Sequence, residues 1–249
     1  MSILEMEDIS FAYGSPREKY RNQVLNHINL CVETDESVGL IGANGVGKST
    51  LLKLLTGLLE MQEGTLRIAG LEMKKENLRA IRAEIGYVFQ DSDSQLFMST
   101  VYDDVAFAPR NYGKSEEETR NMVMKALEQV HMDDRKERQI YRLSGGEKKL
   151  VSIATVLAMG TRLMLLDEPS VALDPGNRRN LIRILNELPG AKIIASHDLD
   201  FVYDTCQRAV LLSEGMIVAD GPAQDILTDR VLLEKHGLEL PLSFSRTAP

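Results

Sequence analysis

The residues GANGVGKST, positions 42–50, follow directly on the short apolar run SVGLI, positions 37–41. They fit the pattern G-x-x-x-x-G-K-[ST] through Gly42, Gly47, Lys48 and Ser49. Glycines at these spacings let the backbone fold round a phosphate, so that several N–H groups converge on its oxygens. The run before it predicts a strand, and the leucine-rich stretch 48–58 predicts a helix. This context favours a phosphate-binding loop over a glycine-rich turn without chemistry.

A second motif, LMLLDEPS at positions 163–170, ends an apolar run in two acids, Asp167 and Glu168. Ligands of α/β sheets bind at the carboxyl ends of strands, where Asp167 could hold Mg²⁺ through water. Neighbouring residues of a strand point in different directions, so Glu168 could face an attacking water. The alternative is a pair of solvated acids in a turn. With the phosphate loop, the motif predicts binding and hydrolysis of a magnesium nucleotide, and leaves kinases, GTPases and ATPases open.

The bulk composition limits the class of protein. A length of 249 residues suits one large domain, or one domain with a subdomain. The net charge of −8 disfavours a nucleic-acid partner. No apolar run approaches the ~18 residues of a membrane span, and no N-terminal signal pattern is visible, so a membrane role would need a separate subunit. Cys31 and Cys206 are predicted to be buried free thiols, which indicates a reducing compartment.

Hydrophobic periodicity predicts strands that alternate with helices, which is typical of an α/β protein with a mostly parallel sheet. The predicted strands are 3–13, 24–33, 37–41, 64–68, 85–89, 163–166, 192–195 and 209–212, and the predicted helices are 48–58, 115–131, 144–159 and 175–188. The helix 115–131 should bury Val123, Ala126, Leu127 and Val130. The polar stretch 14–23 should join the first two strands as a hairpin tip, and the tail SFSRTAP, 243–249, should be frayed.

The stretch LSGGE, positions 143–147, places two glycines in the first turn of a predicted helix. Gly145 and Gly146 each cost a helix roughly 1 kcal/mol against alanine. They leave backbone N–H groups bare at the positive end of the helix, which suits an anion. Ser144 and Glu147 also fit a capping box, and capping alone is the simpler interpretation.

With LSGGE between the two other motifs, the chain resembles the ATP-binding-cassette (ABC) ATPases over nearly its whole length. The resemblance implies ATP and Mg²⁺ as cofactors, ATP hydrolysis, and two copies placed head to tail with the LSGGE helix of one facing the phosphate loop of the other. It implies a single domain, 1–249, of the P-loop NTPase fold with an N-terminal antiparallel β-subdomain. The nucleotide-binding core and β-subdomain comprise 1–89 and 161–240, an inserted helical subdomain comprises 90–160, and a tail comprises 241–249.

The resemblance also implies roles for particular residues. Tyr13 would stack on adenine, Glu168 would act on water, and His197 would sense the γ-phosphate, with Lys48 and Gln90 as further catalytic residues. Ser49, Gln90 and Asp167 would hold Mg²⁺. The implied nucleotide contacts are Tyr13, Gly42, Ala43, Asn44, Gly45, Val46, Gly47, Lys48, Ser49, Thr50, Gln90, Ser144, Gly145, Gly146, Asp167 and Asp174. Local strand packing of Tyr13 and helix capping by Asp174 are the alternatives.

The segment FQDSDSQLFMSTVYDDVAFAPRNYG, positions 89–113, resembles energy-coupling-factor importers, which bring vitamins and transition-metal ions into prokaryotic cells. LSGGEKK, ASHDLDFVYDTCQR and HGLELPL are most similar to the cobalt/nickel branch. The resemblance implies a peripheral protein on the cytoplasmic face of the membrane. Its partners would be a second ATPase subunit, either a copy or a paralogue, and integral membrane coupling and substrate-binding subunits.

Leu96, Phe97 and Met98 would lie at the contact with the membrane subunit, or else form subdomain core. A vitamin importer is the main alternative. A soluble ABC ATPase of DNA repair or translation is less favoured, because the chain has no coiled coil and no second cassette. A metabolite kinase is disfavoured because LSGGE precedes LLDEP. The chain departs from the wider family in Glu147 for glutamine, in Ala172 for glycine, and in the longer stretch 14–23.

Overall fold

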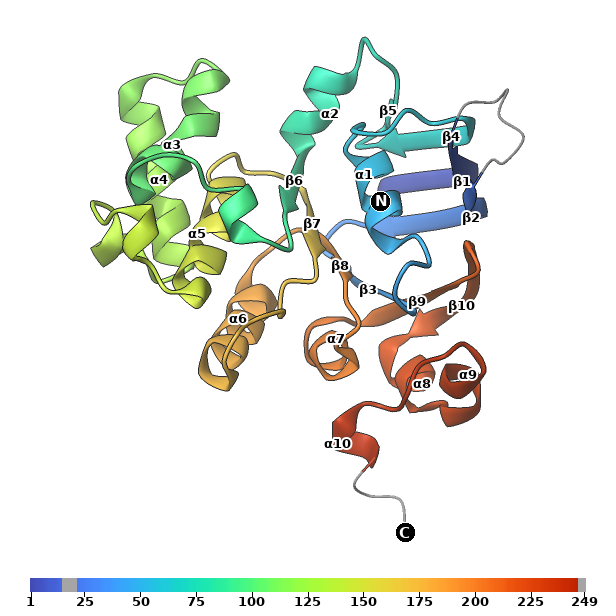
Figure 1. Ribbon diagram of the computed structural model, residues 1–249. Coiled ribbons are helices and arrows are strands. Elements are labelled where there is room, and N and C mark those ends of the chain that lie inside the picture. The colour runs from blue at the N-terminus through green and yellow to red at the C-terminus, as the bar shows by residue number, and fades with distance from the viewer. Residues whose placement is uncertain (15–21, 246–249) are drawn as a thin grey trace.

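The computed structural model describes residues 1–14 and 22–245, and its larger sheet has six strands in the order β10-β9-β3-β8-β7-β6 (Figure 1). The strands are β3 (Ser37–Ile41), β6 (Ile85–Val88), β7 (Leu163–Asp167), β8 (Ala191–Ala195), β9 (Arg208–Ser213) and β10 (Met216–Pro222). All neighbours from β9 to β6 pair in parallel, and β10 pairs antiparallel with β9. The strands β3, β7 and β8 are buried at every position, because both faces of this sheet are covered.

The second sheet is antiparallel and has the order β2-β1-β4-β5. Its strands are β1 (Ser2–Tyr13), β2 (Asn22–Glu33), β4 (Glu63–Ile68) and β5 (Leu71–Glu72). The predicted tip 14–23 is shorter than expected, since β2 already begins at Asn22; residues 15–21 lie outside the described residues. The helix α1 (Lys48–Leu55) ends three residues before the predicted end, because Gly57 adopts a left-handed φ of 64°.

The helical region stands at one side of the molecule, at the left of Figure 1. It contains α3 (Val101–Asn111), α4 (Glu116–Gln129), α5 (Gly145–Leu157) and the 3₁₀ turns η1 (Ser92–Ser94), η2 (Asp133–Arg135) and η3 (Ile140–Arg142). The helix predicted at 115–131 corresponds to α4. All four residues predicted to face inward from it are buried: Val123, Ala126, Leu127 and Val130. This part of the periodicity analysis is confirmed.

The remaining helices are α2 (Leu78–Glu84), α6 (Pro175–Glu187), α7 (Leu199–Thr205), α8 (Ala223–Thr228), α9 (Arg230–Lys235) and α10 (Leu242–Ser245). The prediction of a frayed tail is wrong for 243–245. The carboxylate of Asp200 accepts hydrogen bonds from the backbone N–H groups of Leu242 (2.8 Å) and Ser243 (3.0 Å), and so caps α10. The ring of Phe244 meets that of Tyr203 edge to face at 4.9 Å. Residues 246–249 lie outside the described residues.

Two hydrophobic cores lie on the two faces of the larger sheet. Side chains alternate along β7: Leu163 and Leu165 join one core, and Met164 and Leu166 join the other. The first core also holds α1 and the antiparallel sheet, and the second holds the helical region with α6, α7 and α8. The predicted fold class is confirmed: a mostly parallel core sheet, an N-terminal antiparallel sheet and an inserted helical region.

The two cysteines differ in exposure. Cys206 is buried as predicted, but the prediction is wrong for Cys31, which is exposed on β2. The physical reason is the two-residue period of the strand, because Leu30 and Val32 occupy the buried face and Cys31 falls on the other one. Among residues 1–14 and 22–245, no helix has the length and hydropathy to traverse a bilayer.

Candidate functional site

The order of strands in the larger sheet brings four separate motifs together. β3, β8, β7 and β6 are neighbours and run parallel, so their carboxyl ends meet at one edge. The phosphate loop follows β3, and His197 follows β8. Asp167 ends β7 with Glu168 next to it, and Gln90 follows β6. The edge therefore carries residues from four distant parts of the sequence.

A cavity of about 660 Å³ lies at this edge. Its walls include most of the predicted nucleotide contacts from the phosphate loop and the strand ends. The lining residues are Tyr13, Asn22, Val24, Asn44, Gly45, Gly47, Lys48, Ser49, Thr50, Gln90, Glu168, Val171, Ala172 and His197. Eight predicted contacts do not line this cavity: Gly42, Ala43, Val46 and Asp167, which belong to the phosphate loop and to β7, and Ser144, Gly145, Gly146 and Asp174, which lie at the starts of α5 and α6.

The phosphate loop is held in shape by its own lysine. The Nζ atom of Lys48 donates to the carbonyl oxygens of Gly42 (2.7 Å) and Ala43 (3.2 Å). Burial lowers the pKa of Lys48, while Glu168 and Asp167 act in the opposite direction. A Cβ atom at Gly42 would lie 2.3 Å from the carbonyl oxygen of Leu212, so the loop can approach β9 this closely only with glycine there. In this structure the ammonium group of Lys48 is therefore bound to the backbone of its own loop.

Oxygen atoms suited to Mg²⁺ gather beside the loop. The hydroxyl of Ser49 donates to Oδ1 of Asp167 at 3.1 Å, and the hydroxyl of Tyr87 donates to Oδ2 at 2.9 Å. Burial raises the pKa of Tyr87, so its hydroxyl stays a donor and orients the carboxylate. A serine hydroxyl and a carboxylate are hard oxygen ligands, and this donor set fits Mg²⁺. The role of Tyr87 was missed, because in the sequence it is only one more residue of a predicted strand.

Glu168 and His197 contact each other directly. Nδ1 of His197 lies 2.8 Å from Oε2 of Glu168, which also accepts hydrogen bonds from the backbone N–H of His197 and the hydroxyl of Ser196, both at 3.2 Å. Glu168 is buried and has a left-handed φ of 46°, an unusual conformation for a residue other than glycine. The two adjacent acids thus face different partners, Asp167 the serine of the loop and Glu168 the histidine.

The LSGGE segment forms the start of α5. Ser144 caps this helix in a reciprocal box with Glu147. A Cβ atom at Gly145 would have no heavy atom within 4 Å, whereas one at Gly146 would lie 2.4 Å from the side chain of Asn177. Asp174 caps α6 by accepting from the N–H groups of Gly176 (2.8 Å) and Asn177 (3.0 Å). Capping is therefore present at both helices, and the face of Gly145 is open.

Comparison with known proteins agrees with this geometry. The sequence profile of the ABC transporter family matches residues 25–171, more than half of the chain.

The chain belongs to the ABC transporter family.

An ABC transporter ATP-binding protein of Gloeobacter violaceus is 47% identical to this ABC ATPase over 98% of both chains. An energy-coupling factor transporter ATP-binding protein of Methanothermobacter thermautotrophicus is 41% identical, and the match covers 96% of this chain and 77% of that protein. Among solved structures, cbiO1 of Clostridium perfringens, described as part of the ABC transporter complex cbiONQ, has a TM-score of 0.83 at 32% identity and covers 94% of each chain.

The predicted activity and cofactors agree with membership of this family. The ABC ATPase hydrolyses ATP, and this hydrolysis is coupled to transport. Its cofactors are ATP and Mg²⁺. When bound, Mg²⁺ neutralises charge on the phosphate oxygens.

A buried lysine links α5 to the segment of Gln90. Lys149 is 3% exposed, and its Nζ atom donates to the carbonyl oxygens of Phe89 and Gln90, both at 2.8 Å. Burial lowers the pKa of Lys149 to about 8, although Asp91 and Asp167 act in the opposite direction. The sequence analysis missed this contact, because LSGGEKK placed Lys149 in a motif without showing which loop it reaches.

Lys149 should make stability depend on pH. Its pKa is about 8 in the folded chain against an ordinary 10.5, so the unfolded chain binds more protons between these values and stability rises with pH there. Burying the charged lysine costs stability below pH 8, and Lys149→Met removes this cost. The free energy of unfolding of the wild type should therefore rise by up to about 3 kcal/mol relative to that of Lys149→Met as pH rises from about 8 to about 10.5. Urea unfolding of both proteins across this range is the measurement, and a constant difference contradicts the prediction.

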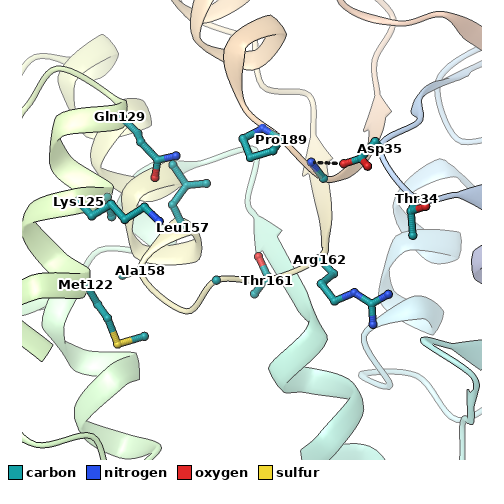
Figure 2. Close-up of a pocket in the computed structure, with 13 residues that line it drawn as sticks. Thr34, Asp35, Met122, Lys125, Gln129, Leu157, Ala158, Thr161, Arg162 and Pro189 are labelled. Carbon is teal, nitrogen blue, oxygen red and sulfur yellow. Dashed lines mark hydrogen bonds between the residues drawn. The ribbon is translucent and has the colours of Figure 1, made fainter. Parts of the chain in front are cut away.

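A second cavity, of about 460 Å³, lies at the opposite edge of the sheet. Figure 2 shows Lys125 and Gln129 of α4 on one side of it and Thr161 and Arg162, which precede β7, on the other. On the core side, the carboxylate of Asp35 accepts from the backbone N–H of Gly190 at 2.9 Å (Figure 2). Residues of both the helical region and the core line this cavity, and none of the predicted site residues does.

Proposed function

We propose that two copies of this ABC ATPase enclose two ATP molecules head to tail and power an energy-coupling-factor importer. The observation that carries the dimer is the open face of Gly145. Its N–H lies at the positive end of α5, a Cβ there would meet nothing, and it lies outside the cavity of its own chain. A phosphate held by a second chain fits this position. A two-fold pair gives two equivalent composite sites, and a paralogue could replace the copy.

Within each site, the residues of the edge divide the work of phosphoryl transfer, which depends mainly on positioning and charge. Lys48 and the N–H groups of its loop neutralise the phosphates. Ser49, Gln90 and Asp167 hold Mg²⁺. The buried carboxylate of Glu168 orients water and takes its proton.

Further residues position the nucleotide. His197 holds the γ-phosphate and the water. Its Nδ1 atom lies 2.8 Å from Oε2 of Glu168, and this contact supports a joint role of the two side chains. Tyr13 stacks on adenine, a role supported by its place in the cavity wall and by a side chain that is 41% exposed. Edge-to-face packing on Phe11 at 5.0 Å, and a hydroxyl 3.3 Å from Oγ1 of Thr50, hold the ring in place. Ser144, Gly145 and Gly146 come from the partner chain, and Asp174 acts across the dimer.

We also propose that the chain acts as one domain with two moving parts. The core with its β-subdomain comprises 1–89 and 161–240, the helical subdomain comprises 90–160, and the tail comprises 241–249. The cavity of Figure 2 lies along this boundary and supports the division.

An exposed aromatic pair supports contact with a membrane subunit. Phe97 is 64% exposed and packs edge to face on Phe107 at 4.8 Å, while Leu96 is buried in the core. The carboxylate of Asp104 accepts from the N–H groups of Phe97 (3.2 Å) and Met98 (3.1 Å) and fixes the loop. We place an integral coupling subunit against Phe97 and Phe107. This puts the ATPase on the cytoplasmic face of a prokaryotic membrane, peripherally bound.

The proposed cargo is cobalt or nickel, supported by the resemblance of LSGGEKK, ASHDLDFVYDTCQR and HGLELPL to the cobalt/nickel branch. Cells that express the ATPase with its membrane subunits should accumulate labelled Co²⁺ or Ni²⁺, and Glu168→Gln should abolish the uptake. Labelled vitamins are tested in parallel. Glu168-dependent uptake of a vitamin alone would reassign the cargo. An ATPase that does not co-purify with membranes when the membrane subunits are present would instead favour a soluble ABC ATPase.

A further inference from the structure

The first turn of α5 carries an acid, Glu147, that lies beside two arginines. The Oε2 atom of Glu147 accepts from the backbone N–H of Ser144 at 2.7 Å. Its Oε1 atom forms an ion pair with Arg135, which ends η2, and lies 3.6 Å from Nη1 of Arg138. We call these three residues the Glu147 cluster. It joins the first turn of α5 to the segment that connects α4 with α5.

Glu147 belongs to the first turn of α5, as does the exposed Gly145. An acid there stabilises the helix itself, because its carboxylate accepts a hydrogen bond from the backbone N–H of the N-cap residue Ser144 and complements the helix dipole. The same negative charge opposes a second anion at that helix end. Partial burial raises the pKa of Glu147, but the contacts with Ser144 and the charges of Arg135 and Arg138 outweigh it and hold the pKa below its ordinary value, so the carboxylate is charged.

We infer that Arg135 and Arg138 neutralise Glu147 and thereby allow the start of α5 to receive the γ-phosphate bound by the partner chain. This inference rests on the composite site proposed above. Arg135 and Arg138 are positioning residues, since they act through Glu147 and need no contact with nucleotide. The acid gives the helix its cap, and the arginines remove the electrostatic cost of that acid for a phosphate.

The test measures ATP-driven dimerisation by analytical ultracentrifugation in a Glu168→Gln background, where bound ATP is not consumed. Arg135→Ala with Arg138→Ala should weaken dimerisation by about tenfold or more, because an unpaired carboxylate is then left in the helix turn that receives the phosphate. Adding Glu147→Gln removes that charge and keeps an acceptor for Ser144. The triple variant should recover dimerisation to within about threefold of the Glu168→Gln parent. ATP binding to the separate chain should stay constant throughout.

Two controls separate charge from structure. Arg79→Ala with Arg120→Ala removes the same charge from exposed positions on α2 and α4, and should leave dimerisation unchanged. Because the arginines of the cluster are partly exposed, the defect should be larger at about 0.05 M than at about 0.5 M salt. If the double alanine variant does not fold, Arg135→Gln with Arg138→Gln replaces it, since glutamine removes the charge and keeps a donor to the carboxylate.

The outcomes distinguish this inference from the proposed function. A Glu168→Gln parent that does not dimerise with ATP removes the composite site itself. If the parent dimerises, unchanged dimerisation of the arginine variants overturns only the neutralising role. A triple variant no better than the double one also overturns it, because the arginines would then act structurally. Loss of dimerisation by Glu147→Gln alone would also overturn the neutralising role, since it would show that the carboxylate itself is needed.

Discussion

Glu168→Gln should bind ATP with unchanged affinity and lose at least about a hundredfold in turnover, because the group that takes the proton of water is gone. The fold should persist. Glutamine keeps an oxygen that can accept from the N–H of His197 and from Ser196, the contacts of the present carboxylate. With binding intact and hydrolysis stopped, the variant should accumulate as an ATP-bound dimer. Phosphate release and size-exclusion chromatography with ATP measure both effects.

The matched control is Glu187→Gln, which makes the same chemical change at an exposed position at the end of α6. It should hydrolyse ATP at the wild-type rate. Normal turnover by Glu168→Gln would remove Glu168 from its proposed role. A variant that stays monomeric with ATP, although it binds the nucleotide, would instead contradict the sandwich of two chains.

The second large effect is expected from Gly145→Asp. A Cβ atom at Gly145 meets nothing within 4 Å, and an acid in the first turn favours a helix, so the single chain should fold and bind ATP. The new carboxylate would occupy the place proposed for the partner's γ-phosphate. ATP-driven dimerisation should then fall by about a hundredfold or more, and turnover should fall with it. Sedimentation with ATP and a nucleotide-binding titration are the two measurements.

Gly145→Asn has nearly the same size without the charge, and it should impair dimerisation less than Gly145→Asp. Equal defects would indicate crowding rather than electrostatic repulsion.

Gly146→Ala is a different case: its Cβ atom would lie 2.4 Å from the side chain of Asn177 and would disturb the contact of α5 with α6. If Gly145→Asp dimerises at the same ATP concentrations as the wild type, this result contradicts the composite site.

Local signals sufficed for the parts of the molecule that depend on neighbours in the chain. Residues 37–58 predicted a strand, a phosphate loop and a helix, and the structure places β3 and α1 on either side of the loop. The caps at Ser144 and Asp174 were predicted because capping uses residues two or three positions apart. The error at Cys31 was also local, since the alternation of Leu30 and Val32 already assigns Cys31 to the exposed face.

Other features depend on contacts between distant segments. Tyr87 and Asp167 are brought together because β6 pairs with β7, and Lys149 reaches Gln90 because α5 packs beside the end of β6. The helix α10 likewise needs Asp200, more than forty positions earlier, as its cap. No periodicity or motif encodes these pairings, since each requires that two segments already lie side by side.

The amino-acid order thus specified the chemical groups: a lysine in a glycine loop, two acids after an apolar strand, a histidine after another strand, and a bare helix start. Folding settled their arrangement. The strand order β3-β8-β7-β6 sets His197 between the phosphate loop and Glu168, and the packing of α5 leaves Gly145 outside the cavity. The reason is physical: side-chain identity and local backbone preference act over a few residues, whereas the meeting of strand ends is decided by how both faces of one sheet are buried.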